Sequence, residues 1–113
     1  MIKGMHAMFY TTDVDATRTF LREVMAFPAT DIGEGWLIFD VPEADLGCHP
    51  HEGKPFHEIS FYCENIETTV ATMKERGAKF LKEPTDQGWG IVAPFEMPGV
   101  GEVAVYQPKY QKG

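Results

Sequence analysis

The sequence predicts an α+β fold built from two tandem βαβββ modules, and three observations support this prediction. Residues 9–17 (FYTTDVDAT) match residues 61–69 (FYCENIETT) position for position, at an offset of 52 residues (61 minus 9). A Gly-Trp pair stands at corresponding points further along, as Gly35-Trp36 and Gly88-Trp89. The chain has 113 residues, a common length for one compact domain. We therefore expect two similar halves that share one core.

The boundaries of the halves follow from this repeat. We expect one domain over residues 1–113, with half-modules at about 1–50 and 56–110. The segment 50–55 (PHEGKP) begins and ends with proline, which favours an extended linker.

The first half is expected to open with a strand at 4–11, because this stretch is rich in strand-forming residues. Thr12-Asp13 supplies a helix N-cap, and the periodic residues Val14, Thr17, Leu21 and Val24 predict a helix to about Met25. Three short apolar segments separated by turn residues are each predicted as a strand, namely 28–32, 35–39 and 45–49.

The second half repeats this order. A strand is predicted at 58–63, followed by a helix that Asn65 caps and Gly77 ends. The apolar stripe of this helix is expected to be Ile66, Val70 and Met73. Three further strands are predicted at 79–83, 88–93 and 101–106, with Pro98-Gly99 as the turn between the last two.

Composition excludes several classes of protein. The net charge of −7 opposes binding to a phosphate backbone, so no nucleic-acid partner is expected. No segment approaches the roughly 18 consecutive apolar residues of a membrane helix, and no targeting stretch is seen, so we expect a cytoplasmic protein without a membrane partner. Cys48 and Cys63 form no CxxC pair, and both are expected to be reduced and buried.

The whole chain resembles the vicinal oxygen chelate (VOC) superfamily, which includes glyoxalase I, extradiol dioxygenases and resistance proteins of the bleomycin and fosfomycin types. The resemblance is carried by residues 61–67 (FYCENIE), by their copy in the first half, and by the closing residues 103–108 (VAVYQP). It implies that the two halves form a curved sheet around a shared cavity, and that the protein is a homodimer.

Metal-binding members of that family place one ligand on the first and last strand of each half. The repeat register puts His6 and Glu58 at the first-strand positions, and Leu46 and Ala104 at the last-strand positions. Leucine and alanine cannot coordinate a metal, so the site is incomplete on this alignment. If a divalent metal (Zn, Ni, Mn or Fe) binds, the expected ligands are His6, Glu58 and Glu102, because Glu102 shares a strand face with Ala104.

A ligand pocket is expected on one face of the strands, since side chains alternate across a sheet. Its expected lining is His6, Met8, Tyr10, Ser60, Tyr62, Trp89, Ala104 and Tyr106. Core packing explains most of the aromatic residues equally well. Trp89 is the exception, because glycines on both sides permit close backbone approach and an exposed ring.

These residues support three functional hypotheses. The leading one is a small-molecule-binding protein of this fold that has lost the full metal site. The alternative is a metal-dependent lyase, isomerase or dioxygenase-like enzyme in which Glu58 or Glu102 moves a proton. Without a metal, His6 and Glu58 could form an acid/base pair, although an interior histidine and a solvated strand-end glutamate explain them equally well. The third hypothesis, a partner-binding module, predicts a domain without an accessible pocket.

Overall fold

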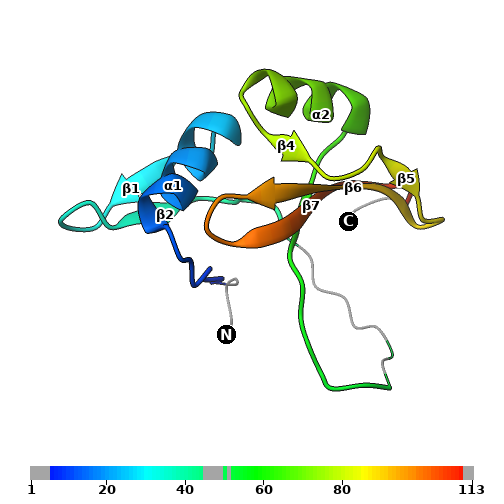
Figure 1. The fold of residues 1–113 in the computed structure, drawn as a ribbon, viewed down its shortest axis with the longest axis horizontal. Helices are drawn as coiled ribbons and strands as arrows, with labels where there is room; N and C mark the ends of the chain where they lie inside the picture. Colours follow the sequence, from blue (N-terminus) through cyan, green and yellow to red (C-terminus); the bar gives the residue numbers. More distant parts are fainter. Residues whose placement is uncertain (1–5, 45–49, 51, 111–113) are drawn as a thin grey trace.

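A computed structural model describes residues 6–44, 50 and 52–110 of the chain. The predicted strand at 45–49, with Leu46 and Cys48, lies outside the described residues. In the first half, α1 (Val14–Thr19) continues into a π-helical turn, η1 (Phe20–Val24), and a hairpin of two short strands follows, β1 (Ala29–Asp31) and β2 (Leu37–Phe39) (Figure 1). The helix and these two strands confirm the corresponding predictions.

The second half supplies a five-stranded sheet and one helix. Its elements are β3 (Ser60–Tyr62), α2 (Ile66–Glu75), β4 (Lys79–Phe80), β5 (Thr85–Asp86), β6 (Gly90–Met97) and β7 (Gly101–Pro108). The strand order is β3-β7-β6-β4, with β5 also paired to β6. β3 runs parallel to β7, and the other pairs are antiparallel. The fold is therefore α+β, and the four strands predicted in this half are present together with β5, which was not predicted.

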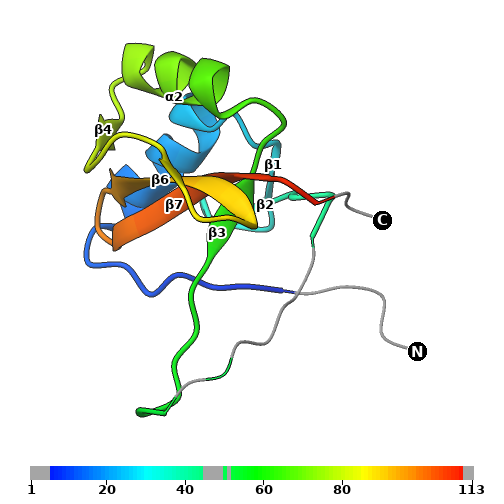
Figure 2. The ribbon, with the colours of Figure 1, turned by 90° about the vertical axis from the view of Figure 1, so that its right-hand side faces the viewer.

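Local sequence signals position both helices. The Asp13 side chain accepts a hydrogen bond from the Ala16 N–H (3.1 Å), and the Asn65 side chain accepts one from the Thr68 N–H (3.0 Å), so both predicted N-caps are confirmed. α2 ends as predicted at Gly77, whose N–H donates to the carbonyl of Lys74 (3.0 Å). Both helices lie on the same face of the β6–β7 pair (Figure 2).

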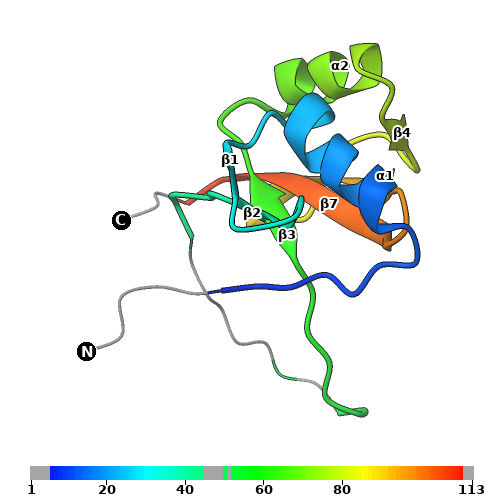
Figure 3. The ribbon, with the colours of Figure 1, turned by 90° about the vertical axis from the view of Figure 1, so that its left-hand side faces the viewer.

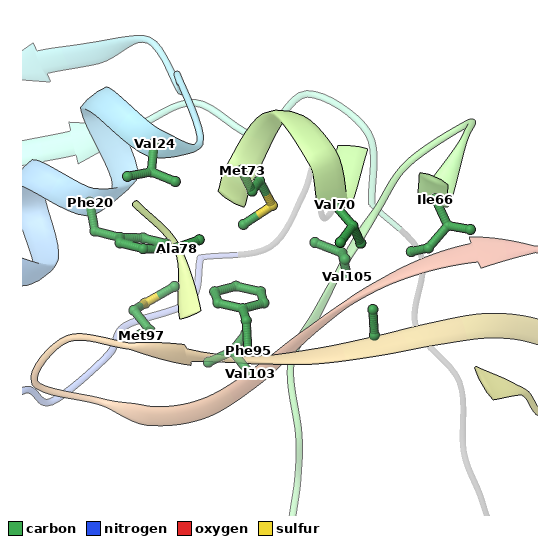
Figure 4. Packing of buried hydrophobic residues seen from close by; sticks show 11 residues of the cluster. Phe20, Val24, Ile66, Val70, Met73, Ala78, Phe95, Met97, Val103 and Val105 are labelled. Carbon is green, nitrogen blue, oxygen red and sulfur yellow. The ribbon is translucent and has the colours of Figure 1, made fainter. Parts of the chain in front are cut away.

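The core lies between the helices and this face of the sheet (Figure 4). Phe95 and Met97 on β6 are fully buried, and the Phe95 ring stacks on Phe20 of η1 with centroids 5.7 Å apart. The predicted stripe of α2 is confirmed, since Ile66, Val70 and Met73 are all buried. In the first helix the buried residues are Thr17, Phe20 and Val24, so Phe20 belongs to a stripe that was predicted to contain Val14 and Leu21 instead.

The start of α1 is tied to the β6–β7 turn. The Thr12 N–H donates to the carbonyl of Gly99 (2.9 Å), and the hydroxyl of buried Thr17 donates to the carbonyl of Pro98 (2.6 Å). A Cβ added at Gly99 would lie 2.2 Å from Oγ1 of Thr11, so only glycine fits at this position. We call the contacts of Thr11, Thr12 and Thr17 with Pro98-Gly99 the threonine latch. Pro98 and Gly99 form the predicted turn, which the Val100 N–H closes by donating to the carbonyl of Met97 (3.0 Å).

The predicted strand at 4–11 is wrong in its described part, because residues 6–11 form no strand. Their side chains favour an extended backbone, but a strand also needs a hydrogen-bonded neighbour, and 6–11 pair with none of the described strands. The segment instead passes below the sheet, on the side away from the helices (Figures 2 and 3). The segment 52–59 also extends away from the body of the domain on that side (Figure 1).

Within the described ranges, neither helix has the length and apolar character needed to cross a membrane.

Candidate ligand-binding site

Alternation along the strands separates a core face from an open face of the sheet. On β7 the side chains of Val103 and Val105 are buried in the core, whereas Glu102 is exposed. β3 and β6 flank β7, with Ser60 and Pro94 as the two neighbours of Ala104. The alternation on β7 is seen at Glu102, Val103 and Val105, and the open face lies opposite the helices.

A cavity of about 590 Å³ lies against this open face. Strands β3, β6 and β7 contribute Ser60, Val92, Pro94 and Ala104 to its lining, and residues 8–10 of the N-terminal segment close part of its rim. This volume is within the range of small-molecule sites in proteins.

The predicted pocket residues are only partly brought together. Five of the eight predicted pocket residues line the cavity, namely Met8, Tyr10, Ser60, Trp89 and Ala104. The two predicted proton-transfer residues, Glu58 and Glu102, also line it.

The other three predicted residues do not line it. Tyr106 is buried, with its ring 5.6 Å from that of Trp89, and its hydroxyl lies 3.2 Å from that of Tyr110. Tyr62 packs edge-on against Tyr106 at 6.4 Å. His6 is exposed to solvent.

The predicted metal ligands do not assemble into a metal site. Glu58 and Glu102 share the cavity, but His6 does not contribute to its lining. In the part of the chain that the structure describes, no three His, Cys, Asp or Glu side chains are grouped so that they could hold a metal ion. The described residues therefore do not offer the three protein ligands that a catalytic zinc site typically has.

Trp89 is presented to the cavity by a tightly bonded turn between β5 and β6. The Gln87 N–H donates to the carbonyl of Gly90 (2.8 Å), and the Lys109 N–H donates to the carbonyl of Trp89 (2.9 Å). Gly88 has a φ of +90°, and a Cβ at Gly90 would lie 2.9 Å from the carbonyl oxygen of Gln107. The φ of Gly88 favours glycine, and Gly90 permits a close backbone approach of the kind that the sequence suggested.

One ion pair braces this turn. The Lys109 ammonium contacts Oδ2 of Asp86, and Oδ1 of Asp86 accepts a hydrogen bond from the Gly88 N–H (2.8 Å). The Lys109 hydrogen bond first, and the Gly88 N–H second, hold the pKa of Asp86 below its ordinary value.

The described cysteine lies beneath the site and does not reach the cavity. Burial raises the pKa of the Cys63 thiol, which donates to the carbonyl of Tyr106 (3.4 Å). A thiol of raised pKa is a poor nucleophile and a poor metal ligand at neutral pH, so Cys63 has a packing role.

Sequence reasoning missed part of the lining. Lys82, Thr85 and Gln87 come from β5 and the loops beside it, and Val92 and Pro94 come from β6. The β6 residues could have been found by extending the alternation rule, because Val92 and Pro94 alternate with buried Ala93 and Phe95. The loop residues carry no motif that marks them.

Comparison with known proteins identifies the family. The sequence profile of the Glyoxalase/Bleomycin resistance protein/Dioxygenase superfamily matches residues 5–99. The chain belongs to this superfamily. The resemblance inferred from the sequence is thereby confirmed, and the superfamily fold agrees with the α+β arrangement of sheet and helices described above. No curated protein sequence matches the chain.

Several solved structures share this superfamily fold. TnmS3, an antibiotic-binding protein from Streptomyces sp. CB03234, aligns with a TM-score of 0.68 at 19% identity, over 96% of this chain and 100% of its own. A superfamily member from Sphaerobacter thermophilus DSM 20745 aligns with a TM-score of 0.67 at 21% identity, over 94% and 98%. A glyoxalase/bleomycin resistance protein/dioxygenase from Nocardioides aligns with a TM-score of 0.62 at 15% identity, over 99% and 93%. At these identities the likeness concerns the fold.

Proposed function

We propose that this superfamily member binds a small organic molecule in the cavity on the open face of its sheet. The observation that carries the proposal is the cavity of about 590 Å³, which combines an exposed indole, Trp89, with the apolar side chains of Val92 and Pro94. Ser60 and Thr85 add hydroxyl groups that can orient a ligand. Apolar side chains combined with polar groups that orient the ligand are the usual composition of a small-molecule site. The antibiotic-binding neighbour TnmS3 supports the same class of function.

Fragment screening by NMR tests this proposal. A library of aromatic and aliphatic fragments is added to ¹⁵N-labelled protein, and the indole N–H signals of Trp89 and Trp36 are followed. Trp36 is the matched control, because both tryptophans expose 52% of their surface but only Trp89 lines the cavity. We expect fragments to shift the signals of Trp89 and Ser60 and to leave Trp36 unchanged. A library in which no fragment shifts the cavity residues contradicts the proposal.

A metal-dependent lyase, isomerase or dioxygenase-like enzyme is the second candidate. One observation favours it, since the carboxyl groups of Glu58 and Glu102 line the same cavity. Because the described residues do not fit a metal, no metal-dependent step follows from this geometry. The test is titration of tag-free protein with Ni, Zn, Mn and Fe, using His6→Ala and Glu58→Gln as variants. Stoichiometric binding that both variants lose would favour the enzyme over the binding protein.

We also propose that the protein is a cytoplasmic homodimer, with half-modules at about 1–50 and 56–110. Tyr10 is 94% exposed and Phe56 is 68% exposed, and both lie on extended segments outside the sheet. Large apolar side chains in such positions are typical of surfaces that another chain covers. Light scattering coupled to size exclusion measures the mass directly, and the 12.7 kDa mass of a single chain would contradict the proposed dimer.

A further inference from the structure

We infer that the ligand of this cavity is a flat aromatic molecule without negative charge, which stacks on Trp89. This inference rests on the proposed function and specifies the class of ligand. It is argued from the support of the indole, the shape of the wall beside it, and the charges around it.

The indole of Trp89 is supported from behind and left open in front. Its ring packs on that of Tyr106 at a centroid distance of 5.6 Å and an interplanar angle of 60°. Tyr106 is only 6% exposed, whereas Trp89 is 52% exposed and lines the cavity. A large aromatic surface that the protein itself leaves uncovered is available to a second ring, and stacked rings attract each other beyond the effect of the area that they bury.

The backbone holds this indole before a ligand arrives. The carbonyl of Trp89 accepts a hydrogen bond from the Lys109 N–H, and the β5–β6 turn is closed by the bond from Gln87 to Gly90. Because the turn is already ordered, a stacked ligand loses little free energy to ordering the protein.

The wall beside Trp89 suits a planar molecule. Val92 pairs with Tyr106, and Pro94 pairs with Ala104, across adjacent strands of one sheet. The side chains Val92, Pro94 and Ala104 line the cavity, and all three are short and lack charge. A sheet surface of short apolar side chains offers an extended face rather than a deep, narrow pit.

The charges around the cavity act against anions. Its charged lining residues are Glu58, Glu102 and Lys82, and His57 also lines it. Glu96 pairs with Glu102 across β6 and β7, which places another carboxylate beside the site. The chain as a whole carries a net charge of −7. A bound anion would therefore meet repulsion, whereas a neutral or cationic ring would not.

Three probes that share one naphthalene ring test the inference. They are 1-naphthylmethylamine, 1-naphthylmethanol and 1-naphthylacetate, which differ in charge and are titrated by calorimetry at low salt. The variants are Trp89→Leu, Glu102→Gln and the control Trp36→Leu. We expect the amine and the alcohol to bind at least about tenfold more tightly than the acetate, a difference of about 1.4 kcal/mol. Trp89→Leu should weaken both by about tenfold and Trp36→Leu by less than twofold.

The outcomes separate the inference from the proposed function. If none of the probes binds the wild-type protein and NMR fragments also leave the cavity signals unmoved, the proposed function fails and the inference falls with it. If the acetate binds as tightly as the amine, and Glu102→Gln leaves that ratio unchanged, the charge selection is overturned while the binding function stands. If Trp89→Leu binds all three as the wild type does while remaining folded by circular dichroism, stacking on Trp89 is overturned.

Discussion

The two halves of the chain carry corresponding tryptophans, which are equally exposed but differently supported. The ring of Trp36 lies under the guanidinium of Arg18, 5.3 Å from its centroid, and belongs to the β1–β2 hairpin, whose strands are three residues long. Trp89 packs on the buried ring of Tyr106 and adjoins β6 and β7, which pair over eight residues each. The comparison teaches that a repeated Gly-Trp signal can position a side chain on the surface, whereas the sheet beneath it decides whether a cavity forms.

Of the predicted changes, replacing a buried phenylalanine should lower the free energy of unfolding most, and one phenylalanine from each half is compared. Phe95 on β6 is fully buried, and Phe39 on β2 is half-buried. Phe95→Ala is expected to lower the free energy of unfolding by about 3–5 kcal/mol, and Phe39→Ala by about 1–2 kcal/mol, because less apolar surface is lost. Urea unfolding followed by circular dichroism gives both values. Equal losses would show that the first half contributes to the core as much as the second.

A matched pair of glycines tests the threonine latch. Gly99 and Gly35 have similar φ angles, +79° and +82°, but an added Cβ at Gly35 meets nothing within 4 Å. Alanine should cost roughly 1 kcal/mol at either position through backbone strain. At Gly99 the contact with Thr11 should add about 1–3 kcal/mol. The difference between the two urea midpoints isolates the latch, and a difference of zero would show that the latch contributes nothing to stability.

Lowering the pH should weaken the Asp86–Lys109 ion pair beside Trp89. Of the three predictions, this one concerns the smallest change in the free energy of unfolding. The pKa of Asp86 is below its ordinary value of 3.8 in the folded state, so the unfolded chain takes up this proton first as the pH falls. The stabilisation is therefore complete above the ordinary value and is lost as the pH drops through the lower, folded pKa. Asp86→Asn should flatten the part of the curve of urea midpoint against pH that lies around and below the ordinary value of 3.8. If the variant keeps the acid dependence of the wild type, Asp86 does not contribute to the pH dependence of stability.

The sequence predicted features that depend on neighbouring residues better than features that depend on contacts between distant segments. The caps at Asp13 and Asn65 and the turn at Pro98-Gly99 involve residues within a few positions of each other, and all were predicted correctly. The strand expected at 4–11 was wrong over 6–11, because strand propensity does not reveal whether a pairing partner lies alongside.

The site shows the same division. Alternation along the strands predicted one shared face for Ser60, Ala104 and Glu102, and in the structure all three line the cavity, because alternation needs only the strand itself. It could not show that Tyr106 would be covered by the Trp89 ring, because that contact depends on how the β5–β6 turn folds over β7. The role of the predicted metal ligands was inferred from a repeat register, which fixes equivalence of position but not distance in space.

The packing of the first helix on Phe95 of β6 has a consequence for synthesis on the ribosome. The first helix is complete once Val24 has been made, but its packing partner Phe95 is added 71 residues later (95 minus 24). At ~5–20 residues per second this interval lasts roughly 4–14 s. An isolated helix of this length is only marginally stable in water, so the nascent first half waits with the apolar face of Phe20 and Val24 uncovered. Chains released early would expose that face and become targets for chaperones and proteases.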